Sequence, residues 1–445
     1  MIEELLQRVL NQAKGAGATA ADVIGVDNLS TVVRVRQGDA ERVEQARQKS
    51  LGLRVFVGDR SATASTSDLT AAGLDMLVDV TVANARVTAA DLSAGLPDQA
   101  ELARGVPDLD LADPSADAFS LDVALDQARR VEAAALAHPD IRQVETSQFS
   151  FSDGAVAFAT TAGFAGAWRS TRFSLHTVPI AAKDGQMVRD WWSTSRRFLA
   201  ELDSPEEVGR IAAERTARRM GAVKPRTADV PVVFDPETAS SLLSHFAGAV
   251  NGYSLYKGAS FLIGRLGQPV ASPLVTIVDD GTIQRGPGSK PFDGEGLATR
   301  RTVVVGDGVL ESWILDVYSA RKLGLRSTGN AARSTGDSPT AAPTNLRLLP
   351  GKSSHEDIVS SVRSGLYVTE LIGFGVNLVT GDYSQGAAGF WIEDGRLARP
   401  VHEVTIAGNL ADMLKQVELV GDDLREDDRV ASPTLKIARM TVGGE

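Results

Sequence analysis

The sequence predicts an α+β protein with two domains. The first is an N-terminal α/β domain over residues 1–224, in which helices pack on a β-sheet, and the second is a mainly β domain over residues 225–445. Three observations lead to this prediction. The chain of 445 residues exceeds the usual size of a single hydrophobic core. Its first half alternates segments of helical and strand periodicity. Beyond residue 260 the chain is mostly short strands separated by Gly, Asp and Pro turns.

The first domain begins with an amphipathic helix, because apolar residues recur at helical spacing over residues 2–10. Short strand-like pieces follow between residues 21 and 67, and a helix over residues 69–87 is expected to pack on them. A stretch rich in Pro and Asp over residues 94–119 predicts a long surface loop. A second helix over residues 120–138 has Ser120 at its N-cap position.

Strands are predicted again over residues 142–199, and a third helix then closes the first domain near Pro225. Ser204 stands at the start of this helix with Glu207 three residues later, which is the capping-box pattern. In the second domain, the segment 330–345 is polar and low in bulk, and we expect it to be a mobile loop.

A helix over residues 236–250 follows a strand, with Asp235 as its N-cap and Pro236 as its first residue. Its apolar residues form one stripe, which is expected to face the core: Ala239, Leu242, Leu243, Phe246, Ala247 and Val250. At 100° per residue, His245 points roughly 130° from the centre of this stripe. His245 is therefore expected to face solvent, a cleft or another subunit.

The bulk composition excludes several classes of function. A net charge of -11 argues against a general nucleic-acid binder. The absence of cysteine excludes disulfides, thiolate zinc sites, iron–sulfur clusters and cysteine nucleophiles, and it fits a reducing compartment. The first residues lack the pattern of a signal peptide, and no apolar run approaches the ~20 residues that span a bilayer. We therefore expect a cytoplasmic protein that binds neither nucleic acid nor membrane.

The other candidate motifs give little support for a binding or catalytic site. The run 373–381 places Leu378 where a dinucleotide-binding loop needs its third glycine, which favours a strand and turn. The pairs His355–Glu356 and His402–Glu403 lack a second histidine one helical turn later, so we expect a helix start and a strand there.

Two further patterns, an acidic stretch and a possible catalytic triad, give no positive evidence for a functional site. The acidic residues Asp279, Asp280, Asp293 and Glu295 lie beside glycines but lack EF-hand spacing, so a solvated turn is the favoured interpretation. No G-x-S-x-G elbow occurs, although a scattered Ser-His-Asp triad stays open on spacing alone.

Four long segments of the second half carry a family resemblance: "VASPLVTIVDDGT", "PFDGEGLATRRTVVVGDGVLESWILDVYSARKLGLRSTGN", "GLYVTELIGFGVNLVTGDYSQGAAGFWIEDG" and "VHEVTIAGNLADML". Together they resemble the TldD/PmbA family, known as modulators of DNA gyrase or metalloprotease subunits, and most of all its PmbA (TldE) branch. The resemblance covers nearly all of residues 225–445 and implies the two-domain architecture given above.

In this family the TldD subunit looks like a zinc protease with a His-Glu-x-x-x-His helix and a cysteine near the C-terminus. The matching positions here hold Ser244, His245 and Ala249, and the cysteine segment falls near residues 426–436, which contain no cysteine. Zinc needs three protein ligands even in an open catalytic site. The resemblance therefore implies a degenerate metal site, with no catalytic residue and no zinc in this chain.

The resemblance further implies a heterodimer in which a TldD-type partner holds the zinc and the pair degrades or trims unfolded peptides. This chain would complete the cleft, and the glycine-rich strand end at Gly381, Asp382 and Tyr383 is the candidate for close approach to a peptide backbone. One alternative is a homodimeric peptide-binding protein without protease activity. Another is an independent hydrolase that uses a different site.

Overall fold

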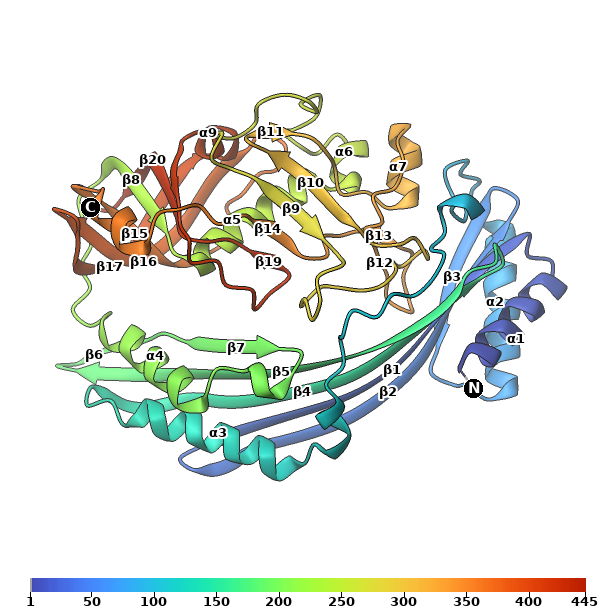
Figure 1. The fold of residues 1–445 in the computed structure, drawn as a ribbon, viewed down its shortest axis with the longest axis horizontal. Coiled ribbons are helices and arrows are strands. Elements are labelled where there is room, and N and C mark those ends of the chain that lie inside the picture. The colour runs from blue at the N-terminus through green and yellow to red at the C-terminus, as the bar shows by residue number, and fades with distance from the viewer. Residues whose placement is uncertain (1) are drawn as a thin grey trace.

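A computed structural model describes residues 2–445, and it confirms the α+β class. Figure 1 shows a long curved sheet formed by the first half of the chain, with the second half lying over its concave side. The chain passes from the first sheet to the second between residues 197 and 227. The boundary between residues 224 and 225 stays a prediction.

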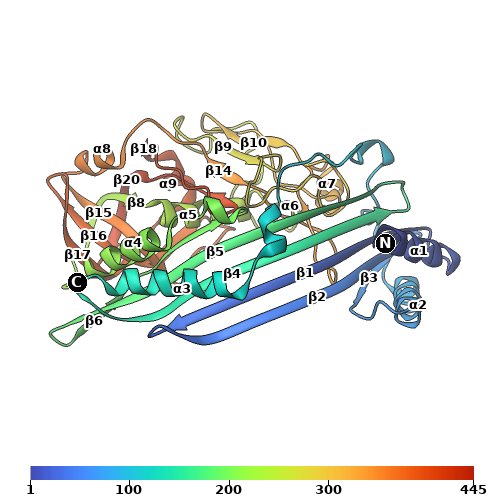
Figure 2. The same cartoon turned by 60° about the horizontal axis from the view of Figure 1, so that its bottom comes forward.

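The first sheet is antiparallel, in the order β3-β2-β1-β4-β5-β6, with β7 also pairing with β5. Its strands are β1 (Ala20–Arg36), β2 (Asp39–Val57), β3 (Arg60–Thr66), β4 (Ile141–Thr160), β5 (Ala165–Lys183), β6 (Gln186–Arg189) and β7 (Trp192–Arg196). Figure 2 shows β1 and β2 running side by side along the sheet.

The prediction of short pieces between residues 21 and 67 is wrong, since β1 and β2 are single strands of 17 and 19 residues. Asn28 lies at the boundary between two of the predicted pieces. It instead pairs with Gln48 on one side and Gly154 on the other, so the strand ladder runs straight through it.

Four helices flank the first sheet: α1 (Ile2–Gly15), α2 (Ala71–Val87), α3 (Leu121–Leu136) and α4 (Pro205–Ala217). The first two pack on one end of the sheet around Leu10 and Leu77. The other two pack against each other and against β4 and β5 (Figure 2). All four helices were predicted, the first from apolar periodicity and the last two with the help of their N-cap residues.

The predicted caps of α3 and α4 are met only in part. Ser120 occupies the N-cap position of α3, but its side chain makes no capping hydrogen bond. Ser204 accepts a hydrogen bond from the Glu207 N–H at 3.2 Å. The Glu207 carboxylate does not complete the capping box by accepting from the Ser204 N–H, because it binds Arg210 instead.

The long connection between α2 and α3 contains only two short 3-10 turns, η1 (Gln99–Glu101) and η2 (Pro114–Ala118), as expected of a surface loop. It also touches the second half of the chain, because the Ala103 N–H donates to the Gly296 carbonyl at 2.9 Å. A third such turn, η3 (Leu199–Glu201), precedes α4.

The second half contains a sheet that closes on itself, in the order β17-β16-β15-β8-β20-β18 with an added pairing of β17 to β20. Its strands are β8 (Ala228–Phe234), β15 (Ser364–Ile372), β16 (Asp382–Glu393), β17 (Arg396–Asn409), β18 (Val417–Val420) and β20 (Leu435–Gly443). A five-stranded sheet, β11-β10-β9-β14-β19, and the pair β12-β13 lie beside it. Their bounds are β9 (Ile277–Asp280), β10 (Arg301–Gly306), β11 (Val309–Leu310), β12 (Ala331–Ala332), β13 (Thr340–Ala341), β14 (Leu346–Leu348) and β19 (Val430–Ala431).

Five helices complete this half: α5 (Pro236–Ala249), α6 (Gly252–Tyr256), α7 (Val317–Leu323), α8 (His355–Ser360) and α9 (Leu410–Lys415). The apolar stripe predicted for α5 is buried in the largest core of the molecule, where Leu242 and Phe246 are almost inaccessible. No helix among residues 2–445 is long and apolar enough to cross a membrane.

Candidate functional site

The helix α5 begins at a strongly determined N-terminus. Asp235 accepts a hydrogen bond from the Thr238 N–H at 2.8 Å, and Pro236 occupies the first turn. Burial raises the pKa of Asp235, although the Arg215 guanidinium lies 3.6 Å from it and opposes the shift. Arg215 comes from α4, so this contact also ties the helix to the first half of the chain.

His245 lies on the side of α5 that faces β16. The Gln385 side-chain amide donates to His245 Nε2 at 3.3 Å, and the imidazole packs edge-to-face on Tyr383 with ring centroids 6.3 Å apart. Burial lowers the pKa of His245, so the ring is neutral at neutral pH. His245 is half-buried, which agrees with its predicted position away from the core stripe.

The other two positions that match the family metal motif have different surroundings. Ser244 is exposed, and its hydroxyl donates to the Ser240 carbonyl one helical turn earlier at 2.9 Å. Ala249 is fully buried. The segment that matches the cysteine region lies beside the helix, where the Ser432 N–H donates to the Ser240 hydroxyl at 3.0 Å.

The donor set at these positions does not fit zinc. One neutral imidazole stands beside a carboxamide and a buried phenol, and Ala249 has no donor atom. Across residues 2–445 there is no group of three or more His, Cys, Asp or Glu side chains that could hold a metal ion. A zinc site needs three protein ligands, so we derive no catalytic step on this helix.

The three residues proposed for a substrate cleft lie at the start of β16. Gly381 has a φ of +82° and closes the turn before the strand, where a Cβ would approach Asn409. Asp382 is exposed and accepts a hydrogen bond from the Thr380 hydroxyl at 2.6 Å. Tyr383 is 1% exposed, and its hydroxyl donates to Gln385, which places it beneath His245. A role for these residues in binding substrate stays a prediction.

The two His-Glu pairs lie in the elements that were predicted for them. His355 is the first residue of α8, and its Nε2 is 3.1 Å from the Tyr367 hydroxyl. His402 lies on β17, and Glu403 pairs with Lys224 at 2.9 Å. The glycine-rich run 373–381 is the connection between β15 and β16, as expected of a strand and turn.

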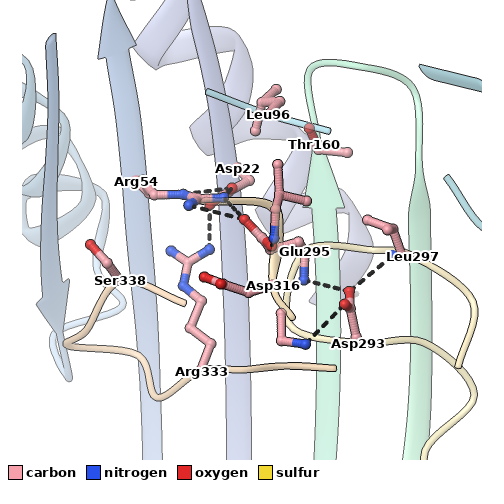
Figure 3. A network of polar contacts seen from close by, with 12 residues as sticks. Asp22, Arg54, Leu96, Thr160, Asp293, Glu295, Leu297, Asp316, Arg333 and Ser338 are labelled. Atoms are coloured by element: carbon pink, nitrogen blue, oxygen red, sulfur yellow. Dashed lines mark hydrogen bonds and ion pairs between the residues drawn. The ribbon is translucent and has the colours of Figure 1, made fainter. Parts of the chain in front are cut away.

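A second cluster of functional groups was missed in the sequence. Asp22 of β1 binds the guanidinium of Arg54 on β2, with the Arg54 Nε to Asp22 Oδ2 distance at 2.9 Å. Asp22 also binds Arg333, and Arg54 lies 3.4 Å from Glu295 (Figure 3). All four side chains are buried, so they form an ion-pair network between the two halves of the chain.

The solvated-turn interpretation of the acidic stretch is therefore wrong for three of its four residues. Asp279, Asp293 and Glu295 are each 1% exposed. Both Asp293 carboxylate oxygens accept backbone hydrogen bonds, among them one from the Ala331 N–H at 3.0 Å (Figure 3). The segment 330–345, for which a mobile loop was predicted, contains the short strands β12 and β13 and carries Arg333 into the network.

Burial raises the pKa of Glu295 to about 8, although the positive charge of Arg54 opposes the shift. Its other oxygen, Oε2, accepts a hydrogen bond from the Val317 N–H at 2.8 Å. The sequence did offer one signal for this network. Asp22 and Arg54 are isolated charges within the apolar runs "ADVIGV" and "GLRVFV", where a strand residue is expected to be buried.

Comparison with known proteins defines the class of this fold. Three family models match consecutive parts of the chain: PmbA/TldA metallopeptidase domain 1 over residues 21–85, the central domain over residues 114–220, and the C-terminal domain over residues 227–444. The chain therefore belongs to the PmbA/TldD metalloprotease family.

Within the family, the chain falls in the PmbA branch. It is 36% identical over 446 residues to Metalloprotease PmbA of Escherichia coli O157:H7, with 100% of this chain and 96% of that protein covered. A Metalloprotease TldD homolog of Haemophilus influenzae is 31% identical, but over only 52% of each chain.

Solved structures agree with this assignment. A protein from Bacteroides thetaiotaomicron, named as a modulator of DNA gyrase, has a TM-score of 0.92 and 28% identity, covering 99% of this chain and 98% of its own. TldE from Thermococcus kodakarensis shares the fold, with a TM-score of 0.88 at 19% identity and coverage of 99% and 100%.

Proposed function

We propose that this chain is the non-catalytic, TldE-like subunit of a two-chain zinc metallopeptidase that acts on unfolded peptides. A TldD-type partner would hold the catalytic zinc. The observation that carries the proposal is the donor set on α5, where Ser244, His245 and Ala249 stand at the family's metal positions. A serine hydroxyl, a neutral imidazole and a methyl group do not supply three zinc ligands.

The structure of this region supports a shaping role. The Ser240–Ser432 hydrogen bond fixes the segment beside α5, and the Tyr383–Gln385–His245 contacts fix the helix against β16. These neutral contacts hold the backbone and side chains of α5, β16 and the segment around Ser432 in one arrangement. This chain would form a wall of the peptide site, while the bond-breaking groups would come from the partner.

An exposed apolar group near α5 supports the need for a partner. Phe374 is fully exposed, and Ile372 and Val379 are more than half exposed, all in or beside the connection between β15 and β16. This connection reaches α5, because a Cβ added at Gly248 of the helix would lie 2.9 Å from Leu378 Cδ1. Exposed apolar residues that gather in one place mark interaction surfaces.

The test is to purify this chain alone, the TldD-type chain alone, and the two together, and to measure cleavage of an unstructured peptide. We expect no cleavage by this chain alone and cleavage by the mixture. The TldD-type chain alone serves as the control for zinc content. Proteolysis by this chain alone would overturn the proposal. Recovery of the native protein as a homodimer with no TldD-type chain would instead favour the homodimeric peptide-binding protein.

A further inference from the structure

A cavity of about 470 Å³ lies between the two halves of the chain, next to the buried ion-pair network. Its walls come from the start of β3, the loop 88–95, α6, the N-terminus of α7 and the segment 338–341. Arg54 and Asp316 line it, and Figure 3 shows Asp316 and Ser338 on either side of Arg333. Cavities of this size at a boundary between domains are typical of ligand sites.

One wall of the cavity is aromatic. Tyr253 and Tyr256 of α6 meet edge-to-face with ring centroids 5.4 Å apart, and Tyr256 meets Tyr318 of α7 in the same way at 5.7 Å. Lys257 lies 5.4 Å from the Tyr256 ring and Lys322 lies 5.2 Å from the Tyr318 ring, so protein cations already occupy ring faces. Phe56 and the alanines Ala89, Ala90, Ala94 and Ala341 add apolar groups to the lining.

Two charged groups of the lining, Arg54 and Asp91, already form ion pairs inside the protein, and the third, Asp316, accepts hydrogen bonds from Ser319. Arg54 binds Asp22 and Glu295. Asp91 accepts hydrogen bonds from the Tyr318 hydroxyl at 2.7 Å and from Lys322 at 2.9 Å. Asp316 caps α7 by accepting from the Ser319 N–H at 3.0 Å. A charged ligand would have to displace one of these partners, whereas a neutral aromatic ring would lose nothing by entering.

The position of the cavity suits the side chain of an extended peptide. Ser61 of β3 belongs to its lining, and β3 is an outer strand of the first sheet. A peptide that runs along an outer strand places alternate side chains on one face, where pockets select them.

We propose that this cavity is a specificity pocket that receives an uncharged aromatic side chain of a bound peptide. This inference rests on the proposed function, because it assumes that the ligand is a peptide. The tyrosine wall supplies edge-to-face contacts to the incoming ring, and the apolar remainder of the lining removes it from water. The ion pairs of Arg54 with Asp22 and of Asp91 with Lys322, and the hydrogen bonds from Ser319 to Asp316, disfavour charged side chains, because each would have to displace one of these partners.

The test uses four small probes with the full chain: the N-acetyl amides of phenylalanine, alanine, lysine and glutamate, each titrated by ligand-observed NMR. We expect the phenylalanine amide to bind about tenfold more tightly than the alanine amide, which corresponds to about 1.4 kcal/mol. The lysine and glutamate amides are expected to bind no more tightly than the alanine amide. Equal dissociation constants for the phenylalanine and alanine amides would overturn the inference.

Three variants localise the effect. Tyr256→Ala should remove most of the preference for the phenylalanine amide. Ala90→Trp should also remove this preference, because the indole would fill the cavity. Ala90 is exposed, so this substitution leaves the core untouched. Trp191→Ala is the matched control, because this exposed aromatic residue lies outside the cavity, next to β7. Loss of the preference in Trp191→Ala, or its survival in Ala90→Trp, would contradict the assignment.

The two proposals fail in different ways. Absence of cleavage by the mixed chains, with the phenylalanine preference intact, would refute only the protease subunit role. Cleavage by the mixed chains, with equal affinity for all four amides, would refute only the specificity pocket.

Discussion

The helix α5 and the buried ion-pair network differ in how much charge their side chains carry. The positions on α5 that the family resemblance matches to a metal motif hold a serine, a neutral histidine and an alanine. The network holds Asp22, Arg54, Glu295 and Arg333, all buried between the two halves of the chain. Strongly shifted pKa values often mark catalytic sites. In this chain the large pKa shift belongs to Glu295, which lies in the ion-pair network between the two halves. The positions on α5 carry almost no charge.

The largest effect is expected from breaking the network. Arg54→Met would remove one of the two guanidinium groups that pair with the buried Asp22 carboxylate, and breaking such a buried pair costs about 3–5 kcal/mol. Arg47→Met on the same strand is the matched control. Its side chain is 61% exposed against 8% for Arg54, and its pair with Asp27 has similar geometry. Exposed pairs contribute about 0–1 kcal/mol.

Urea denaturation of both variants measures this difference. The account predicts that Arg54→Met lowers the free energy of unfolding several-fold more than Arg47→Met. Equal losses in the two variants would show that the network does not join the halves of the chain.

The next effect concerns pH. Burial raises the pKa of Glu295 from 4.5 to about 8, so the folded chain holds this proton more tightly than the unfolded chain. The contribution of Glu295 is therefore fully present below pH 4.5 and is lost as the pH rises towards 8. Glu295→Gln should reduce this loss, which denaturation at pH 5, 7 and 9 would detect. An unchanged pH dependence in the variant would contradict the assigned shift.

A smaller effect is expected at the exposed apolar group. Phe374→Ser should weaken association with a TldD-type chain about tenfold, as truncation of an aromatic anchor does, while stability changes by less than about 0.5 kcal/mol. Met76→Ser on α2 is the control, since Met76 is also exposed but lies at the far end of the first sheet. Isothermal titration calorimetry measures both. Similar affinities for the two variants would place the interface elsewhere.

The smallest effect is expected at His245. Its replacement by alanine removes one hydrogen bond to Gln385, which is worth about 1 kcal/mol. Burial lowers the pKa of His245, so the small stabilisation is present above its ordinary pKa of 6.5 and is lost as the pH falls through the lowered value. We expect the mixed chains to keep their kcat with His245→Ala. A drop of 100-fold or more in kcat would assign the histidine a catalytic role.

The sequence predicted well whatever depends on local periodicity. Leu242 and Phe246 were placed in the core from helical spacing alone, and His245 was placed off that stripe. The cap at Asp235 also follows from local residue types, because its partner is the N–H of Thr238.

The sequence did not predict what depends on distant partners. Glu295 lies 241 residues after Arg54 in the chain. No residue near Glu295 in the sequence indicates that its side chain contacts a guanidinium from the other half of the chain. A glycine-rich acidic stretch is usually a solvated turn, and only the fold shows that Asp293 satisfies backbone N–H groups in the interior. The length of β1 was missed because it depends on continuous pairing with β2 on one side and β4 on the other.

The central claim is that this chain lacks the catalytic metal of its family. Metal analysis by mass spectrometry on the isolated chain, after dialysis against zinc and removal of loosely bound ions, tests it most directly. With a TldD-type chain as the positive control, the account predicts one zinc per TldD-type chain and much less than one per copy of this chain. One zinc per copy of this chain, lost in His245→Ala, would contradict the account.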